Sequence, residues 1–338
     1  MFNYLAPPNA CYEFERIYST QQWAKKQRWI SDYLFKYQPD IIAFQEVFSI
    51  ESLHVLVQQQ GYDYFAVVDE PDIVDDFIYT RPVVAIASRF AIKDVAVVCH
   101  DTELAQALGL SRDFSFSRRV LRATVDVPHI GDSDCYVVHF KSKRAMFAMD
   151  EAHKAWSAEK TIIEHLKTDI AGGWASTVQR GSEATLLMID IITRREHTQN
   201  PMILMGDFNN NLADGVLSHL LTNSLRFASA VDCNNYLAKY CLNDAWELFI
   251  KSQKSSTDPA QQTTATEFIR TPTHYYAASS AVLDYILLSC EFDAGYLGSF
   301  YEVSRYDVVD EHLINPVFER DDQSTDHAVV MITLTLRS

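Results

Sequence analysis

Two short apolar runs, each followed at once by polar residues, constrain this fold more than any other feature of the sequence. Ile41–Phe44 ends at Gln45–Glu46, and Met202–Met205 ends at Gly206–Asp207. A continuous apolar run of this length, without alternation, is typical of a strand that is buried on both faces. Such strands need a covering layer on each side. The pattern therefore favours sheets in the interior of the protein and helices on the outside.

The first two helices are marked by their ends. A capping-box signal joins Ser19 to Gln22, and apolar residues then recur at helical spacing until Pro39 stops the pattern. Ser49–Gln60 predicts a second helix, because apolar residues again repeat every three to four positions.

The middle of the chain is also helical in character. Residues 145 to about 195 favour helix, and we expect Gly172–Gly173 to break it. Further helical segments are predicted from Val216 and over Asp244–Lys251. The residues of Lys251–Thr266 are mostly serine, threonine and glutamine, which predicts a surface loop.

Valine-rich and isoleucine-rich runs bounded by polar turns predict the remaining strands. They are Tyr64–Val68, Val83–Ser88, Val95–Cys99, Leu121–Val127, Cys135–Phe140, Val282–Leu288 and Ala328–Leu336. Helices separate groups of strands without a regular strand–helix–strand alternation, which favours two packed sheets over a doubly wound sheet. No linker divides the chain, so residues 1–338 are predicted to form a single domain.

The charge of the chain limits its partners. Its formal net charge is −16, which disfavours nucleic-acid binding through a broad electrostatic surface. A local basic patch or a bound metal cation would still hold an anionic substrate. No stretch approaches the ~20 apolar residues of a membrane span, and the start carries no secretory signal. We expect a monomer, cytoplasmic by default, with secretion left open if an upstream segment is missing.

Acids and histidines fall at the ends of the predicted strands. Strand ends can gather at one rim of a sheet although they are far apart in sequence, and converging carboxylates repel one another unless a cation binds. Carboxylate and amide oxygens suit Mg²⁺ or Mn²⁺ better than zinc. Histidines beside such a metal can act as general acid or base. The residues placed in this way are Glu46, His139, Asp207, Asn209, Asp284, Asp326 and His327.

Each of these residues also has an ordinary structural interpretation. Glu46 is, by itself, most often an exposed acid, and Asp207 with Asn209 resembles an Asx turn. A lone His139 in an apolar strand is more often a hydrogen-bonded core histidine. Asp284 is harder to dismiss, because an acid inside an apolar run is costly unless it is paired. We predict His327 as its partner.

Five segments together resemble the endonuclease/exonuclease/phosphatase (deoxyribonuclease-I-like) superfamily, in the order that the family shows. The resemblance extends from about residue 3 to 336. It implies an α/β (α+β) fold, a four-layer sandwich of two packed mixed sheets flanked by helices, and a Mg²⁺-dependent phosphoester hydrolase. The segments are Pro39–Val47, Val137–Ser142, Gly206–Asn209, Leu283–Leu287 and Ser324–Val329.

The resemblance also implies roles for the residues that match. Glu46 is the principal metal ligand, and Asp326 is a further metal ligand. Asp207 positions or deprotonates the attacking water, and Asn209 holds the phosphate or the metal. His327 contacts the scissile phosphate or serves as base.

Two further roles and one departure follow from the same comparison. Asp284 would orient His327, and His139, which resembles the deoxyribonuclease and sphingomyelinase branches, would protonate the leaving oxygen. Family members begin with a buried strand that ends in an asparagine near the metal. This chain has almost no room for that strand, so we expect it to be truncated. Asn3 is the matching metal-site asparagine, with Asn9 as the weaker candidate.

The basic residues suggest where a phosphate binds. Residues 112–144 hold seven basic and four acidic side chains, against the acidic average of the chain. Lys141 and Arg118 are the candidates for the substrate phosphate. The substrate class is a phosphoester of a nucleic acid, a nucleotide or a phospholipid head group, with a small or single-ended one favoured over duplex DNA. Two alternatives to a phosphodiesterase or nuclease remain: a catalytically impaired binding protein on this fold, and a phosphomonoesterase.

Overall fold

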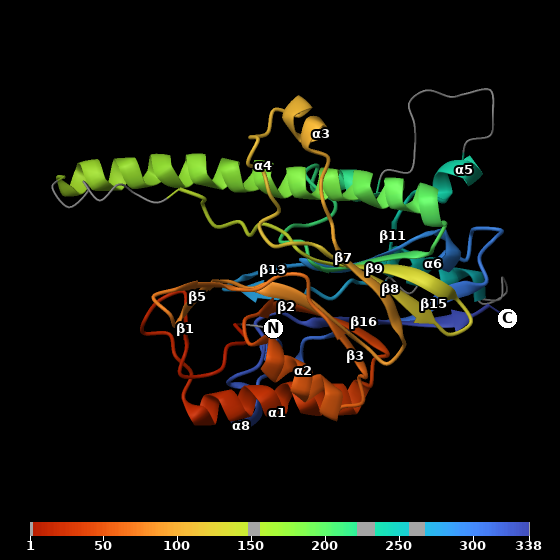
Figure 1. Cartoon of the computed structure of the whole chain (residues 1–338), viewed down its shortest axis with the longest axis horizontal. Coiled ribbons are helices and arrows are strands. Elements are labelled where there is room, and N and C mark those ends of the chain that lie inside the picture. The colour runs from red at the N-terminus through yellow and green to blue at the C-terminus, as the bar shows by residue number, and fades with distance from the viewer. Residues whose placement is uncertain (1–2, 148–155, 222–233, 257–267, 338) are drawn as a thin grey trace.

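The computed structural model describes residues 3–147, 156–221, 234–256 and 268–337. Its main elements form four layers, namely helix, sheet, sheet and helix (Figure 1). Helix α4 (Ala158–Thr198) lies along one outer face, and α1 (Thr20–Tyr37) and α2 (Ile50–Gln59) lie along the opposite face. The predicted arrangement of sheets between helices is therefore confirmed.

The first sheet has six strands in the order β11-β14-β10-β9-β8-β7. Strands β9 and β10 are parallel, and every other neighbouring pair is antiparallel. A parallel pair needs a long crossover, and α4 supplies it. The strands are β7 (Ile92–Val97), β8 (Leu121–Val127), β9 (Gly131–His139), β10 (Met202–Asp207), β11 (Asn243–Asp244) and β14 (Asp284–Leu288).

The second layer is split into two antiparallel sheets. One has the order β2-β6-β3, with β2 at Ile41–Val47, β6 at Val83–Ser88 and β3 at Tyr64–Ala66. The other pairs β15 (Tyr301–Val309) with β16 (Val329–Leu336). Within the described ranges no strand joins β2 to β16. The second of the two predicted mixed sheets is thus two separate antiparallel sheets. The parallel pair of β9 and β10 makes the first, six-stranded sheet mixed.

The remaining elements are short. The strands are β1 (Ala10–Cys11), β4 (Asp72–Val74), β5 (Ile78–Arg81), β12 (His274–Tyr276) and β13 (Ser279–Ala281). The helices are α3 (Thr102–Ala107), η2 (Ser218–Leu221), α5 (Asn234–Ala238), α6 (Ala245–Ser256), η4 (Cys290–Phe292), α7 (Glu311–Ile314) and α8 (Phe318–Asp321). Of the helix expected from Val216, the described residues show the 3₁₀ turn η2, and the segment after Leu221 lies outside them. Helix α6 continues into the predicted loop after Lys251, whose later part lies outside the described residues.

Helix α1 begins as its sequence predicts. The Ser19 side chain accepts a hydrogen bond from the Gln22 backbone N–H, and the Gln22 side chain accepts one from the Ser19 backbone N–H. The predicted break at Gly172–Gly173 is wrong, because α4 continues through both residues. Gly172 instead permits a close approach: a Cβ there would lie 2.7 Å from the Cβ of Ala145. No helix in the described ranges is both long and apolar enough to cross a bilayer.

Alternation along the central strands builds two cores. On β9, Cys135 and Val137 pack between the two sheet layers, whereas Tyr136 and Val138 pack beneath α4. A third core lies between β2-β6-β3 and helices α1 and α2. In β2, however, Ile41–Ala43 are only half-buried. The expectation that this run is buried on both faces is therefore wrong for three of its four residues.

Candidate active site

Three polar side chains form a row across the end of the first sheet. Strand β10 pairs with β9 so that Asp207 lies opposite His139, and with β14 so that Asp207 lies opposite Asp284. Val137, Met205 and Ile286 lie two positions from His139, Asp207 and Asp284 respectively, and all three pack between the sheet layers. Because side chains alternate along a strand, the row faces the second layer as well.

Gly206 allows Asp207 to reach its position in this row. The φ angle of Gly206 is 145°, and a Cβ there would lie 2.0 Å from the carbonyl oxygen of Val138. Asp207 is only 7% exposed. Its carboxylate accepts hydrogen bonds from the Asn209 backbone N–H at 2.7 Å and from the Asn209 side-chain amide at 3.1 Å. That amide also donates to the Phe140 carbonyl at 2.9 Å, so Asn209 positions Asp207.

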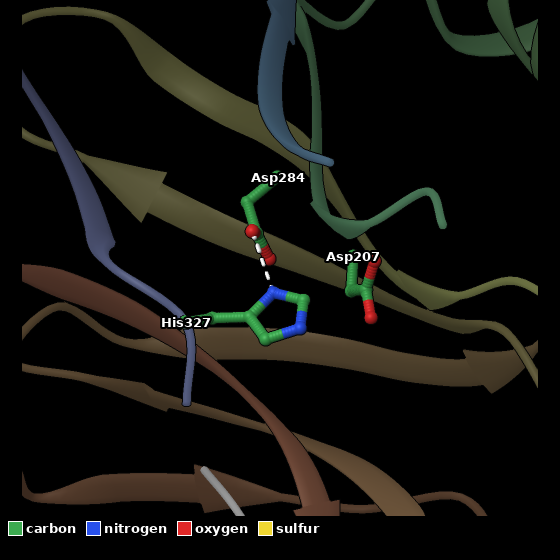
Figure 2. Close-up of side chains that lie close together, drawn as sticks. All are labelled: Asp207, Asp284 and His327. Carbon is green, nitrogen blue, oxygen red and sulfur yellow. Dashed lines mark hydrogen bonds and ion pairs between the residues drawn. The ribbon is translucent and has the colours of Figure 1, made fainter. Parts of the chain in front are cut away.

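His327 reaches the row from the second layer, just before β16. Its Nδ1 lies 2.8 Å from Oδ2 of Asp284, which is the pairing that the acid in an apolar run led us to expect. Figure 2 shows the imidazole ring between Asp284 and Asp207. A carboxylate oxygen of each aspartate and a ring nitrogen of His327 lie within 4.8 Å of one another.

Glu46 lies in a β-bulge at the end of β2. The pairing register with β6 shifts between Phe44 and Val47, and Glu46 has a left-handed φ of 60°. The backbone N–H of Asn3 donates to Oε2 of Glu46 at 2.9 Å. Tyr4 then makes an isolated parallel bridge with Val47. Asn3 is thus beside Glu46, and its backbone rather than its side chain makes the described contact.

Lys26 is a site residue that the sequence argument missed. It lies on the buried face of α1 and is 2% exposed. Burial lowers the pKa of Lys26 to about 8, and the charges of Asp326 and Glu46 oppose this change. Both carboxylates therefore act on one buried ammonium group. The available signal was its position three residues after Trp23, within the apolar stripe of an amphipathic helix.

The chemistry of the donors distinguishes two groups of acids. Asp284 and His327 bond to each other through Oδ2 and Nδ1, which leaves the second ring nitrogen of His327 and the other carboxylate oxygen of Asp284 as the atoms able to bind an ion or a substrate. Glu46 and Asp326 offer carboxylate oxygens, which are the donors that Mg²⁺ prefers. Their charges act on the same point, the Lys26 ammonium. The carboxylates of Glu46 and Asp326 have the chemistry for a hard divalent cation, and a metal site there stays a prediction. The ligand atoms that lie within 4.8 Å of one another are those of Asp207, Asp284 and His327.

Burial and charge separate the three titrating groups of the row. Burial raises the pKa of Asp207 to about 7, and the negative charge of Asp284 adds to this effect. Burial alone would lower the pKa of His327, but its ion pair with Asp284 outweighs burial and raises it to about 10. Burial and the charge of Arg118 hold the pKa of His139 well below its usual value. At neutral pH His327 is therefore an imidazolium, whereas His139 is neutral.

The remaining predicted residues lie beside the row. His139 Nε2 is 3.4 Å from Oδ2 of Asp207. Lys141 follows β9, and its ammonium donates to the backbone carbonyl of Arg144 at 3.1 Å. Arg118 is half-buried, and its charge acts on both His139 and Lys141. Asn9 donates its backbone N–H to the Ala6 carbonyl within its own turn.

His274 is a second residue that the sequence argument missed. It begins strand β12, and its ring centroid lies 4.8 Å from that of His327. The backbones of the two histidines also form an isolated antiparallel bridge. Burial lowers the pKa of His274, and the positive charge of His327 lowers it further. No sequence pattern marks this residue, because tertiary pairing alone brings the β12–β13 hairpin to the site.

An Asp284→Asn variant is expected to lower the pKa of His327 from about 10 toward its ordinary value of about 6.5. The amide keeps the side-chain shape but removes the negative charge that holds the proton. Nuclear magnetic resonance of the imidazole in EDTA-treated protein measures this directly. The His327 ring should titrate near neutral pH in the variant and stay protonated to about pH 9 in the wild type. Identical titration in both proteins would disprove the charge coupling.

The sequence profile of the Endonuclease/Exonuclease/phosphatase family matches residues 17–292. This match ends before Asp326 and His327, which the structure brings to the site. No curated protein sequence matches the chain.

Solved structures share the fold over nearly the whole chain. The human Nocturnin catalytic domain, solved with a bound sulfate anion, is 17% identical, covers 99% of this chain and 93% of that one, and gives a TM-score of 0.54. A humanized D. rerio TDP2 carrying 14 mutations is 13% identical, covers 94% of each chain and gives 0.51. A family protein from Leptotrichia buccalis C-1013-b is 16% identical, covers 94% and 95%, and gives 0.50. These likenesses show the deoxyribonuclease-I-like sandwich, and the profile covers most of the sequence. The chain therefore belongs to the endonuclease/exonuclease/phosphatase family.

Proposed function

We propose that this protein is a metal-dependent hydrolase of phosphodiester bonds. Members of its family are metal-dependent phosphoesterases. The observation that supports the proposal most is the row of His139, Asp207 and Asp284, which meets His327 from the second layer. A buried carboxylate and a held imidazolium lie within one small volume, as an in-line displacement at phosphorus requires.

Asp207 is the proposed general base. Its raised pKa of about 7 makes it a stronger proton acceptor than an ordinary aspartate, and it remains substantially ionised near neutral pH. The two hydrogen bonds from Asn209 fix the carboxylate, so that it can orient a water molecule against the phosphorus atom. Asn209 therefore acts through Asp207 as a positioning residue.

His327 is the proposed donor to the phosphate. Asp284 keeps the imidazole protonated and fixes the ring, because Nδ1 donates to its carboxylate. The second ring nitrogen then donates to a non-bridging oxygen or protonates the leaving oxygen. This assignment moves the acid role from His139 to His327. His139 is 5% exposed, and its lowered pKa keeps the ring neutral. It therefore lacks the second ring proton that a histidine donates when it acts as a general acid.

Glu46 and Asp326 would hold a magnesium or manganese ion, with Asn3 beside them. When bound, this ion would stabilise the negative charge that develops on the phosphoryl oxygens. Lys26 lies within the field of the same two carboxylates and lowers their mutual repulsion. Lys141 and Arg118 are proposed to attract the substrate phosphate, since their charges lie beside His139.

The proposed substrates are small or single-ended phosphodiesters. The chain carries a net charge of −16, so the positive field that duplex DNA needs is confined to the edge near Lys141 and Arg118. Nucleotides, single nucleic-acid ends and phospholipid head groups all present one phosphodiester to such an edge. The loops around the rim, rather than the row itself, would distinguish among them.

Hydrolysis of bis(p-nitrophenyl) phosphate is expected with Mg²⁺ or Mn²⁺ and is expected to stop with EDTA. The physical reason is that Glu46 and Asp326 are negatively charged, so a cation must bind to them before the negatively charged phosphate of the substrate can lie beside them. Release of p-nitrophenol at several metal concentrations measures the activity. p-Nitrophenyl phosphate, assayed in parallel, separates a diesterase from a monoesterase.

Two results would overturn the proposal. Faster turnover of the monoester than of the diester would assign a phosphomonoesterase. Metal binding by calorimetry without turnover of either ester would assign a binding protein on this fold.

A further inference from the structure

Helix α4 carries a row of apolar side chains on the side that faces away from the rest of the protein. Figure 1 shows the N-terminal half of this helix, in yellow-green, extending past the ends of the sheets. The members of the row are four residues apart and are 40% to 69% exposed. None of them belongs to a hydrophobic cluster of the described chain. This row, which we call the outer ridge, consists of Ile162, Leu166, Ile170, Trp174 and Val178.

The buried side of α4 fixes the direction of the outer ridge. Gly172, Ser176 and Arg180 are the first buried residues of the helix. The Ser176 hydroxyl donates to the backbone carbonyl of Arg144, and the Arg180 guanidinium donates to that of Lys141 at 3.0 Å. Each of the three residues lies two positions from a member of the outer ridge. Two positions on an α-helix are about 200° apart, so the ridge lies on the opposite side from these contacts.

The exposure of the outer ridge is unfavourable for a helix of this kind. Residues 158–171 contain no buried residue, although they span most of the ridge. Isolated helices shorter than ~12–15 residues are marginal in water, and most helices in proteins are stabilised by packing an apolar face. The first half of α4 therefore has an apolar face of the kind that packs, without a surface in the described chain to pack against.

Gly173 is a second, independent sign of a missing neighbour. A Cβ at Gly172 would lie 2.7 Å from the Cβ of Ala145, so the fold itself requires that glycine. A Cβ at Gly173 would meet no atom within 4 Å. Glycine inside a helix is destabilising relative to alanine, and no contact in the described chain offsets this effect at Gly173. Gly173 follows Ile170 by three positions, so it lies on the side of the ridge, where it permits another backbone to approach closely.

Spacing and area identify the neighbour as α4 of a second copy. Side chains at every fourth position form a ridge, and two such ridges pack into each other's grooves with helix axes that cross at about 50°. A two-fold axis at Ile170 would place Leu166 of one copy beside Trp174 of the other. The five side chains expose roughly 650 Å², so two copies would bury roughly 1,300 Å², which lies in the range of stable interfaces.

A lipid surface fits the same face less well. Helices that lie on membranes carry mainly lysine and arginine on their polar side. Residues 158–171 hold three acidic and two basic side chains, and the whole chain has a formal net charge of −16. Anionic lipids would therefore repel this region, whereas a second copy requires only apolar contact along the ridge.

We propose that the outer ridge of α4 binds the outer ridge of a second copy in an antiparallel, two-fold symmetric dimer. This dimer would replace the monomer that we expected from the sequence. It would cover the exposed apolar face on both copies and use the open surface at Gly173.

The test is sedimentation velocity of the whole chain from about 1 to about 100 µM, because self-association depends on concentration. The wild type is expected to sediment as a dimer at the upper end of this range. A Leu166→Glu/Ile170→Glu variant should remain a monomer throughout, since the contact would bury unpaired charges. The matched control is Phe35→Glu/Val55→Glu, which changes two exposed apolar residues of α1 and α2 and should keep the wild-type dimer.

A Gly173→Gln variant separates association from folding. The single chain has open space for this side chain, so circular dichroism and the melting temperature of the monomer should not fall. The dissociation constant of the dimer should rise at least about tenfold, because the side chain would fill the position of close approach.

A wild type that stays monomeric across the whole range would overturn the proposal, and so would a dimer that the Leu166→Glu/Ile170→Glu variant retains. Flotation with vesicles of phosphatidylcholine and phosphatidylserine tests the other occupant. Binding of a monomeric wild type to these vesicles, lost in the same variant, would assign the outer ridge to a lipid surface instead.

Discussion

An Asp207→Asn variant is expected to lose at least about a thousandfold of the wild-type kcat/KM toward a phosphodiester. The amide keeps the volume of the side chain and can still accept one of the two hydrogen bonds from Asn209, but it cannot accept the proton of the attacking water. Activity is measured on bis(p-nitrophenyl) phosphate with Mg²⁺. Far-ultraviolet circular dichroism should be identical in the two proteins.

Stability gives this variant a second readout. The pKa of Asp207 is raised to about 7 in the folded chain, above its unfolded value near 3.8. Its contribution to stability is therefore present at acidic pH and is lost as the pH rises through 7. In EDTA, the melting temperature of Asp207→Asn should match that of the wild type near pH 4 and exceed it above pH 7.

The matched control is Asp214→Asn, which alters an exposed acid after the same strand. This variant should keep wild-type kcat/KM. A value for Asp207→Asn within about tenfold of the wild type would remove Asp207 from the chemistry.

A Gly206→Ala variant is expected to lose roughly 4 kcal/mol of the free energy of unfolding, or to fail to fold. A Cβ at this position would lie 2.0 Å from the Val138 carbonyl oxygen and 2.9 Å from its carbon. These are backbone atoms of the neighbouring parallel strand, so no side chain can rotate away. Strands β9 and β10 must separate, which pulls His139 and Asp207 apart. Urea unfolding followed by tryptophan fluorescence measures the loss.

Gly215→Ala is the control for this substitution, because a Cβ there meets no atom within 4 Å. It should change the free energy of unfolding by less than about 1 kcal/mol. Equal stability of the two variants would show that β9 and β10 tolerate a wider spacing than the structure has.

The sequence predicted those features that depend on local pattern. The capping box of α1, the buried runs of β9 and β10, and the acid of β14 each carry their cause in a few adjacent residues. The Asp284–His327 contact was predictable because an unpaired acid in an apolar run is costly. The row itself was predictable because His139, Asp207 and Asp284 lie at strand ends, and strand ends gather at one rim of a sheet.

Features that depend on distant neighbours were not predictable in this way. Gly172–Gly173 has the composition of a helix break, but Gly172 serves the close packing of Ala145 against α4. Ile41–Ala43 has the pattern of a fully buried run, yet its burial depends on what lies beside β2. Lys26 and His274 belong to the site only through tertiary contacts, since neither follows a strand end.

The backbone at Glu46 and Asn209 links the site to the stability of the fold in an unfavourable way. Both residues hold a left-handed φ, 60° and 53° respectively, which costs a non-glycine residue about 1 kcal/mol. Glycine would adopt the same angles without that cost. Selection for stability alone would therefore favour glycine at both positions, although the proposed chemistry depends on the two side chains. Glu46 and Asn209 therefore hold their proposed roles at a cost in stability that glycine would avoid.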